Sequence, residues 1–370
     1  MCKRENNLRG IRVKLQSSED ILLTESAIPE KKNASYRTIS WIAAGAVLLC
    51  LAVLGTWELL QDRIHLERRM RFIMDTYVTI YAAGPSSLTL PAINAAFDRM
   101  EAVDAKFSIS NTENPVNAFN EKGLPITDTE ILEVLQAALH ITLDSEGAFD
   151  ITTAPIIDLW GFYGNSPRLP SKMEIDSCLM HVGFEHLSLS PRDLRKDDPD
   201  VRIDLGGIAK GYAIGQAASV LKEYGITSAL IDAGGDVYAL GKRGKNPWKV
   251  GIKNPRGDGI LGYVEVVNMA VMGSGDYERF FEIDGKRYHH IFNPRTGYPV
   301  AGITGSVLLC RDPMMADGWN TAVFAMGMRK GLDLVSRRSD MEVLMISDAG
   351  EILASEGLKT SLHMKAERKP

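Results

Sequence analysis

One segment of the chain pairs acidic and basic side chains with a glycine turn. Residues 202–212, RIDLGGIAKGY, run from an apolar strand pattern through two glycines into a helical pattern, and Asp204 and Lys210 bracket the turn. Glycines let a backbone approach a phosphate closely, and the free N–H groups at a helix N-terminus favour an anion. The segment is therefore a candidate phosphate site. A plain strand-to-helix turn fits the same pattern, because neither common nucleotide-binding glycine motif is present.

Asp317 and Thr321 form a second candidate group. They follow Asp312-Pro313, a cap and first-turn proline that start a helix. Residues four apart share one helix face, so a carboxylate and a hydroxyl lie together there. Hard cations such as Mg²⁺ prefer oxygen ligands of this kind. Both residues could instead be purely structural. An acid such as Asp317 is favourable near a helix N-terminus, and the hydroxyl of Thr321 could donate a hydrogen bond to a carbonyl one turn earlier in the helix.

His289 and His290 are adjacent in a strand pattern, so they point to opposite faces and only one can face a given pocket. The turn 293–297 follows, which places His290 near a loop edge, where binding sites often lie. A histidine with a purely structural role fits equally well.

Two further turns carry carboxylates. Asp232 and Asp236 flank a glycine pair between two strand patterns, and Asp150 lies in the polar turn 147–152 ahead of the apolar stretch 155–162. The first pair is a candidate for catalysis. Aspartate is also common in turns because its side chain bonds to nearby backbone amides, and the apolar stretch is typical of a core.

Hydrophobic periodicity predicts the elements that position these residues. Four helices are predicted, at 91–107, from 127 to about 145, at 208–224 and from 313 to about 326. Thr127 with Glu130 indicates a capping box, and Asp284-Gly285 is the strongest signal for a hairpin turn. Strands are predicted at 72–81, 228–232, 237–240, 248–252, 261–267, 280–283, 286–290, 342–347 and 351–355. Because short turns join many strands, we expect an α+β fold: a single large domain with a mixed, largely antiparallel sheet and flanking helices.

Composition excludes several classes of protein. Of the 370 residues 45% are hydrophobic, which argues against a disordered, collagen-like or coiled-coil chain. The 42 Lys and Arg residues are outnumbered by 47 Asp and Glu residues, and no basic block stands out, so nucleic acid is not an expected partner. The four cysteines form no CxxC pair, which argues against a zinc site or a disulfide framework.

An apolar run near the N-terminus predicts a membrane anchor. Residues 39–57 include 19 positions without a charge, just enough to cross a bilayer core, with Trp41 and Trp57 near the ends. A buried core helix and a cleaved signal peptide are the alternatives. We interpret the chain as a cytoplasmic tail (1–38), one transmembrane helix in the cell membrane (39–59), a linker (60–71), an extracytoplasmic domain (72–360) and a C-terminal tail (361–370).

Seven stretches, taken in order, resemble the ApbE family, the FAD:protein FMN transferases. They are MDT at 74–76, FS at 107–108, FDIT…P…LWGF at 149–162, IDLGGIAKGYA at 203–213, AGGD at 233–236, SGDYERFFEIDGKRYHHIFNPRTGYP at 274–299 and ADGWNTAVFAMG at 316–327. The resemblance runs from about Met74 to Ser355 and implies an ApbE-like, T-fold-like domain. An anchored, extracytoplasmic position is also common in this family.

The resemblance implies an activity. Members of the family move the FMN half of FAD onto a threonine hydroxyl of an acceptor protein and release AMP, with Mg²⁺ required. The expected partners are thus FAD, as substrate, and an acceptor flavoprotein, either a subunit of a redox complex or a secreted protein. A FAD pyrophosphatase that gives FMN and AMP, and a flavin-binding protein without turnover, are the alternatives.

Twelve residues of this chain are predicted to form the site. The resemblance implies metal ligands at Asp317, Thr321 and the Gly207 carbonyl. His290 is the candidate base that removes the proton of the attacking hydroxyl, since a neutral imidazole is available near pH 7. The implied FAD contacts are Met74, Ser110, Ala148, Phe149, Asp150, Asp204, Lys210 and Phe292.

Four positions depart from the family pattern. Ser110 stands where an aromatic residue often stacks on the adenine, so FAD binding here is expected to be weaker or to use another aromatic residue. Asp75 replaces a common glycine, Gly215 a common acid and Asn293 a common aspartate.

Overall fold

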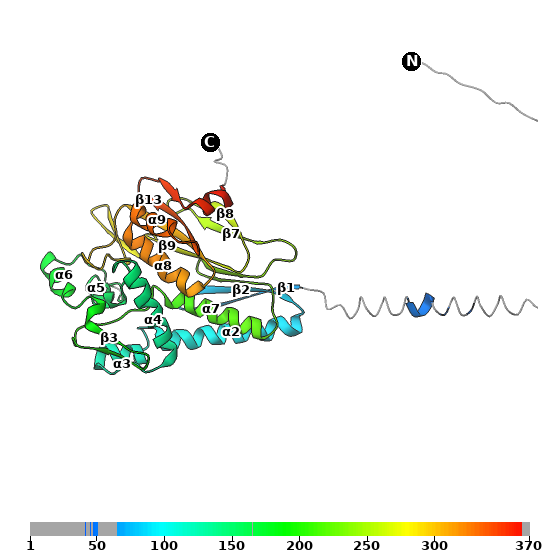
Figure 1. Cartoon of the computed structure of the whole chain (residues 1–370), viewed down its shortest axis with the longest axis horizontal. Helices are drawn as coiled ribbons and strands as arrows, with labels where there is room; N and C mark the ends of the chain where they lie inside the picture. The colour runs from blue at the N-terminus through cyan, green and yellow to red at the C-terminus, as the bar shows by residue number, and fades with distance from the viewer. Residues whose placement is uncertain (1–40, 42–44, 46, 51–64, 165, 365–370) are drawn as a thin grey trace, which may run out of the picture. The chain divides into compact units, whose positions relative to one another are not determined.

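An eight-stranded sheet, in which every pair of neighbouring strands is antiparallel, lies at the centre of the fold (Figure 1). In spatial order its strands are β1 (His65–Ile73), β2 (Thr76–Gly84), β5 (Ala229–Ala233), β6 (Asp236–Leu240), β9 (Met269–Gly275), β12 (Ile303–Cys310), β13 (Met341–Ser347) and β14 (Ile352–Ala354). The structure is a computed structural model that describes residues 41, 45, 47–50, 65–164 and 166–364. The chain divides into two units, 1–61 and 62–370, and the sheet belongs to the second.

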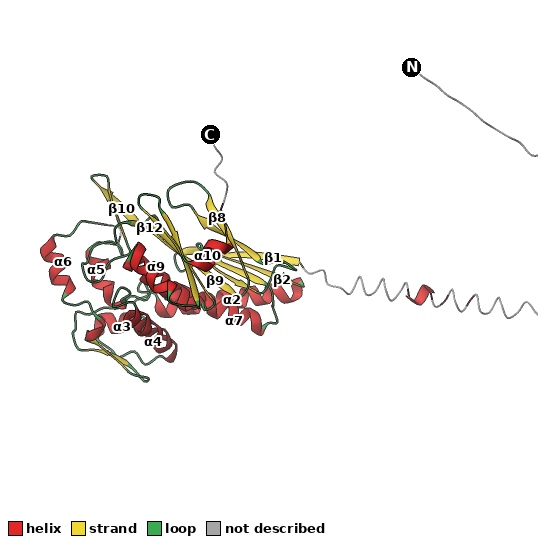
Figure 2. Cartoon of the chain, turned by 45° about the horizontal axis from the view of Figure 1, so that its top comes forward, coloured by secondary structure: helices red, strands yellow, loops and turns green. Residues whose placement is uncertain are grey.

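Helices cover one face of this sheet (Figure 2). They lie in the order of the strands that they contact: α2 (Ser86–Phe107) on β1 and β2, α7 (Ala209–Glu223) on β5 and β6, α8 (Pro313–Met326) on β9 and β12, and α9 (Met328–Ser336) on β13. Apolar residues at helical spacing on α2, such as Ile93, Phe97 and Met100, are fully buried against the sheet. The other helices are α3 (Pro115–Lys122), α4 (Thr129–Asp144), α5 (Ala154–Leu159), α6 (Lys172–Leu179) and α10 (Glu356–Ser361).

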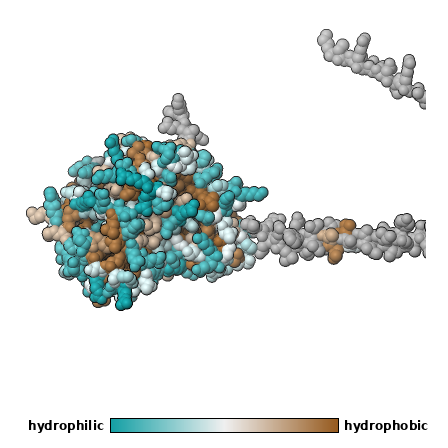
Figure 3. Space-filling model, in the orientation of Figure 1, coloured by the Kyte–Doolittle hydropathy of each residue, from teal (hydrophilic) through white to brown (hydrophobic). Residues whose placement is uncertain are grey.

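A smaller sheet packs on the opposite face. Its strands, in spatial order, are β15 (Leu362–Met364), β8 (Ile260–Val266) and β7 (Trp248–Lys253). Apolar side chains of both sheets, among them Val271 and Leu344 from the large sheet and Trp248 from the small one, form a second core. Figure 3 shows that hydrophilic residues cover most of one face of this unit, while hydrophobic side chains gather in smaller areas.

Two hairpins complete the fold. The first joins β10 (Phe280–Ile283) to β11 (Lys286–His289) through the predicted hairpin turn at Asp284 and Gly285, whose φ angles of 51° and 74° are those of a type I′ turn. Tyr288 of this hairpin packs on the buried ring of Trp160, with ring centroids 5.5 Å apart. The second hairpin pairs β3 (Leu187–Leu189) with β4 (Leu194–Lys196).

Most predicted elements are confirmed, including the α+β class, the helices at 208–224 and 313–326 and the strands between 228 and 290. The single strand predicted at 72–81 is wrong, because Met74 and Asp75 form a two-residue turn between β1 and β2. Consequently β1 occupies most of the predicted linker, and β15 extends the domain beyond residue 360 into the predicted tail.

Two further details differ from the prediction. Asp128 caps α4 by accepting the N–H groups of Glu130 and Ile131, so the capping box at Thr127 is wrong. The central strands β9 and β12 were not predicted, because both are buried on two faces and lack the alternation of polar and apolar residues that marks a half-exposed strand.

The predicted tail at 1–38 lies outside the described residues. So does the predicted anchor at 39–59, apart from helical residues at 41, 45 and 47–50. Among the residues that the structure describes, no helix has the length and apolar character needed to span a membrane.

Candidate active site

A cleft of about 600 Å³ gathers the predicted site residues. Its walls come from segments that are far apart in the sequence: the β1–β2 turn, the end of α2, the segment before α5, both ends of the turn into α7, α8 and the segment after β11. All twelve predicted residues line it: Met74, Ser110, Ala148, Phe149, Asp150, Asp204, Gly207, Lys210, His290, Phe292, Asp317 and Thr321. Their proximity is thus observed, while their individual roles stay predictions.

Two hydrogen bonds join α7 and the turn before it to α8, and the three candidate metal-ligand residues, Gly207, Asp317 and Thr321, line the same cleft. The Thr321 hydroxyl donates to the Gly207 carbonyl at 3.3 Å, and Asp317 Oδ2 accepts the Gly211 N–H at 2.8 Å. Asp317 is buried, and burial together with the charge of Asp236 raises its pKa to about 7. The charged carboxylate is thus disfavoured at this position, and a cation beside it would favour the charged form.

This donor set fits Mg²⁺. The oxygens of a carboxylate, a hydroxyl and a backbone carbonyl are hard ligands of the type that Mg²⁺ takes. Thr321 Oγ1 and the Gly207 oxygen lie 3.3 Å apart, so both could serve as ligands of one ion.

Lys210 lies in the first turn of α7, beside this oxygen set. Its ammonium is 2.6 Å from Asp236 Oδ2, and the other carboxylate oxygen of Asp236 accepts the Gly273 N–H at 2.8 Å. The charge of Asp236 raises the pKa of Lys210 against the opposing effect of burial, so the lysine stays charged. Asp236, a carboxylate that the turn pattern left open, thus fixes Lys210 in place.

Asp204 orders the turn that precedes α7. Its carboxylate accepts the Gly206 N–H and the Tyr163 hydroxyl, both at 2.5 Å, and its backbone N–H donates to the Ile151 carbonyl at 2.7 Å. The Asp150 carboxylate, in turn, accepts the Thr152 N–H at 2.8 Å. The two turns that the sequence singled out separately therefore form one connected wall.

The β1–β2 turn forms another edge of the cleft. Met74 and Asp75 have φ angles of 54° and 57°, which the type I′ turn demands but which non-glycine residues adopt at a cost. The Met74 N–H donates to Asp104 Oδ2 at 3.2 Å. Asp75 thus sits in a conformation that glycine adopts readily, in line with the glycine that is common at this position.

Ser110 is at the exposed end of the cleft and supplies no ring. Aromatic side chains line the cleft elsewhere: Phe107, Phe149, Phe162, Tyr163 and Phe292. The cleft therefore offers other rings for stacking on a base or a flavin.

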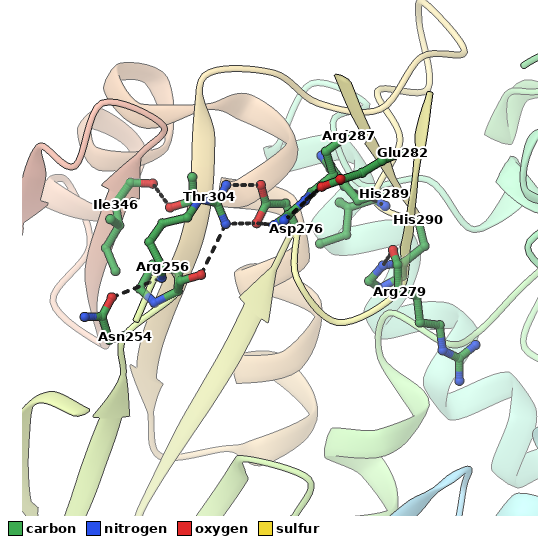
Figure 4. A network of polar contacts seen from close by, with 12 residues as sticks. Asn254, Arg256, Asp276, Arg279, Glu282, Arg287, His289, His290, Thr304 and Ile346 are labelled. Carbon is green, nitrogen blue, oxygen red and sulfur yellow. Dashed lines mark hydrogen bonds and ion pairs between the residues drawn. The ribbon is translucent and has the colours of Figure 1, made fainter. Parts of the chain in front are cut away.

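His290 follows directly after β11. Its backbone N–H donates to the Arg279 carbonyl at 3.2 Å, and its ring Nδ1 is 3.3 Å from the same oxygen (Figure 4). A carbonyl oxygen only accepts, so Nδ1 carries the proton in this contact and Nε2 of the neutral ring keeps a lone pair. Burial, with smaller effects of His289 and Arg279, lowers the pKa of His290 to about 3, so the ring is neutral at pH 7.

His289 points away from the cleft, as its place beside His290 on the strand predicts. It is 3% exposed, its Nε2 donates to the Val300 carbonyl at 2.8 Å, and its Nδ1 accepts the Ile291 N–H at 3.2 Å. Because both ring nitrogens form hydrogen bonds with the backbone, the environment of His289 is that of a residue with a structural role.

The polar residues of the cleft that were missed from the sequence include Asp104, Tyr163 and Glu278. Asp104 and Tyr163 carry no local signal, because only the fold brings them to Met74 and Asp204. Glu278 lies inside the stretch 274–299, and desolvation raises its pKa to about 7 against the effect of Lys210. Because Glu278 lies in a loop shortly after a strand, where site residues often occur, its position could have been used to predict it as a site residue.

Comparison with protein families aligns residues 74–345 with the ApbE family. The chain belongs to the ApbE family. The FAD:protein FMN transferase of Vibrio cholerae is 32% identical over 318 residues, which are 83% of this chain and 93% of that protein. That of Salmonella typhimurium is 31% identical over 270 residues, 68% of this chain and 76% of that protein.

Solved ApbE structures share the fold. The ApbE protein of Thermotoga maritima superposes with a TM-score of 0.76 at 33% identity, covering 80% of this chain and 99% of that one. The flavin transferase ApbE of Vibrio cholerae superposes with a TM-score of 0.72 at 28% identity, covering 81% and 100%. The ApbE match spans every predicted site residue, from Met74 to Thr321.

Proposed function

We propose that this ApbE-family chain transfers the FMN moiety of FAD to a threonine hydroxyl of an acceptor protein and releases AMP. One observation carries the proposal: oxygen-bearing candidate ligands, a half-buried lysine held charged by Asp236 and a neutral imidazole share one cleft. Breaking a pyrophosphate requires that negative charge on two phosphoryl groups be offset and that the attacking hydroxyl lose its proton. The names of the related FAD:protein FMN transferases support this assignment.

Asp317, Thr321 and the Gly207 carbonyl would hold Mg²⁺. Bound there, the ion would neutralise charge on the phosphates of FAD and orient them. Asp317 contributes the only formal charge of the three ligands, so we expect its carboxylate to dominate the affinity of the site for the metal.

Lys210 and His290 have complementary tasks. Lys210 stays protonated because Asp236 holds it, so it offsets phosphoryl charge without giving up its proton. His290 accepts the threonine proton at Nε2 while the threonine oxygen bonds to the phosphorus of the FMN half. The bond from that phosphorus to the bridging oxygen breaks, and AMP leaves with its electron pair.

The proposal includes a membrane anchor at 39–59, with the larger unit outside the cytoplasm. The run of 19 uncharged residues supports it. The acceptor would then be an extracytoplasmic protein or domain.

The test uses the full chain in detergent with FAD, Mg²⁺ and candidate acceptor flavoproteins, each compared with a variant that lacks its threonine. We expect AMP release that matches the gain in mass of the intact acceptor. FMN and AMP formed at the same rate without an acceptor would instead show a FAD pyrophosphatase. FAD bound with no AMP released would show a flavin-binding protein without turnover.

A further inference from the structure

Asp276 is a buried carboxylate outside the cleft. It follows β9 directly, is 6% exposed, and does not line the cleft. The guanidinium of Arg256 donates to both of its oxygens, Nη1 to Oδ1 at 2.8 Å and Nη2 to Oδ2 at 2.5 Å. Arg287 approaches Oδ1 at 3.6 Å (Figure 4). A bidentate pair of this kind is geometrically specific as well as strong.

These contacts join separate parts of the fold. Arg256 belongs to the loop between β7 and β8, Arg287 to β11, and the backbone N–H of Asp276 donates to the Thr304 carbonyl of β12 at 3.1 Å. The β10–β11 hairpin pairs with no other strand in the described part of the chain. Arg287, which also pairs with Glu282 across the hairpin, is therefore an ionic link from the hairpin to the end of β9.

The same network leads to His290. The connection from β9 to β10 begins at Asp276 and ends at Arg279, whose carbonyl accepts from both the backbone and the ring of His290. Asp276 thus holds the start of the connection directly, and it holds β11, which ends one residue before His290, through Arg287. The two groups in the Nδ1 contact, the His290 ring and the Arg279 carbonyl, are therefore both held in place through the Asp276 carboxylate.

We infer that Asp276 is a positioning residue for His290. Through Arg287 and the connection 276–279, it holds the Arg279 carbonyl against Nδ1–H, which leaves Nε2 as the proton acceptor of the ring. The inference rests on the proposed function for its effect on rate, but the placement of the ring is testable without turnover. A shift of about 1 Å in a reacting group costs up to about 100-fold in rate.

The test compares two variants in the full chain. Asp276→Asn keeps the shape of the side chain and removes its charge, and Arg287→Gln cuts only the link to the hairpin. We expect kcat for flavin transfer to fall 10- to 100-fold in both, with the Kd for FAD and its KM within twofold of wild type. Arg287→Gln keeps the inference testable if Asp276→Asn does not fold. Asp276→Glu is expected to recover part of the rate because it restores the charge.

Leu358→Ala is the matched control, since it truncates a fully buried side chain in α10 that lies in the second core. We expect it to lower the melting temperature while kcat stays at the wild-type value. A loss of rate in this variant equal to that of Asp276→Asn would assign the effect to general instability and overturn the inference.

Nitrogen NMR of ¹⁵N-histidine-labelled protein reports on the ring itself. His290→Gln identifies its signals, and the Nδ1–H tautomer should dominate in wild type but mix with the Nε2–H tautomer in Asp276→Asn. An unchanged tautomer together with wild-type kcat in both folded variants would overturn the inference. If the wild type itself fails to transfer flavin, the proposed function fails, and the NMR comparison still decides the role of Asp276.

Discussion

At the scale of single residues, His290 and His289 differ in what surrounds them. His290→Ala should slow flavin transfer about 10²- to 10⁴-fold, the usual value of a general base, and should leave FAD affinity unchanged. His289→Ala should mainly lower stability, because it removes a ring bonded to Val300 and packed edge-on against Phe324. Transfer rates at saturating FAD and Mg²⁺, with melting temperatures, check both. If His290→Ala transfers flavin at the wild-type rate, a carboxylate such as that of Asp204 must act as the base.

The depressed pKa of His290 has consequences for pH. A pKa near 3 keeps the base neutral as the pH falls, so His290 should cause no loss of single-turnover transfer between about pH 8 and 5. Stability should behave differently. The unfolded chain takes up this proton near pH 6.5, before the folded one, so stability is lost as the pH falls from there toward 3. Between about pH 8 and 4, the melting temperature of wild type should therefore fall by more than that of His290→Gln.

Asp317 is buried, so the variant that tests its role should preserve the size of its side chain. Asp317→Asn keeps an acceptor for the Gly211 N–H and should abolish Mg²⁺-dependent AMP release. Because the folded-state pKa is raised, the charge of Asp317 costs stability above the unfolded pKa, so without Mg²⁺ the variant should melt no lower than wild type at about pH 8. A magnesium titration of AMP release and a thermal melt check this, and normal turnover at low Mg²⁺ would contradict the metal assignment.

At the scale of elements, the contact between α7 and α8 sets the spacing of the metal ligands. A Cβ at Gly211 would lie 2.2 Å from the Pro313 carbonyl, so Gly211→Ala must push the helices apart. We expect a loss of about 1–3 kcal/mol in the free energy of unfolding and a higher Mg²⁺ requirement. At Gly215, one turn on, a Cβ would meet Pro313 at an ordinary 3.4 Å, so Gly215→Ala is the control and should be tolerated. Equal tolerance of both would show that this contact does not hold the site together.

At the scale of the whole molecule, the prediction to be tested is that the chain is anchored in the membrane with its larger unit outside the cytoplasm. If 39–59 is an uncleaved anchor, the mature protein should keep its N-terminus and fractionate with membranes. Protease added outside intact cells should then digest the larger unit, while a cytoplasmic marker protein stays intact. Soluble mature protein that begins after Trp57 would show a cleaved signal peptide instead.

Local chemistry made parts of this molecule predictable from the sequence. Asp284-Gly285 favours its turn by backbone preference, Asp312-Pro313 starts α8, and the spacing of Asp317 and Thr321 puts both on one face of that helix. The ordered motifs of the ApbE family contain ten of the twelve candidate residues, all but Ser110 and Ala148, and all twelve lie in one cleft. Each of these signals depends only on residues close together in the chain or on the motif order.

Contacts between distant segments were decided only by the tertiary structure. The turn at Met74 and Asp75 adopts positive φ angles without a glycine because the pairing of β1 with β2 imposes them, and the sequence around it read as one strand. Tyr163 meets Asp204 and Asp236 meets Lys210 across long separations in the chain. Asp276 likewise pairs with Arg256 of the β7–β8 loop and with Arg287 of the hairpin. Such pairs leave no local pattern, since burial and electrostatics select them only once the sheet has brought the segments together. Residue spacing therefore determined which groups can do the chemistry, and the packing of the elements determined their protonation states and orientations.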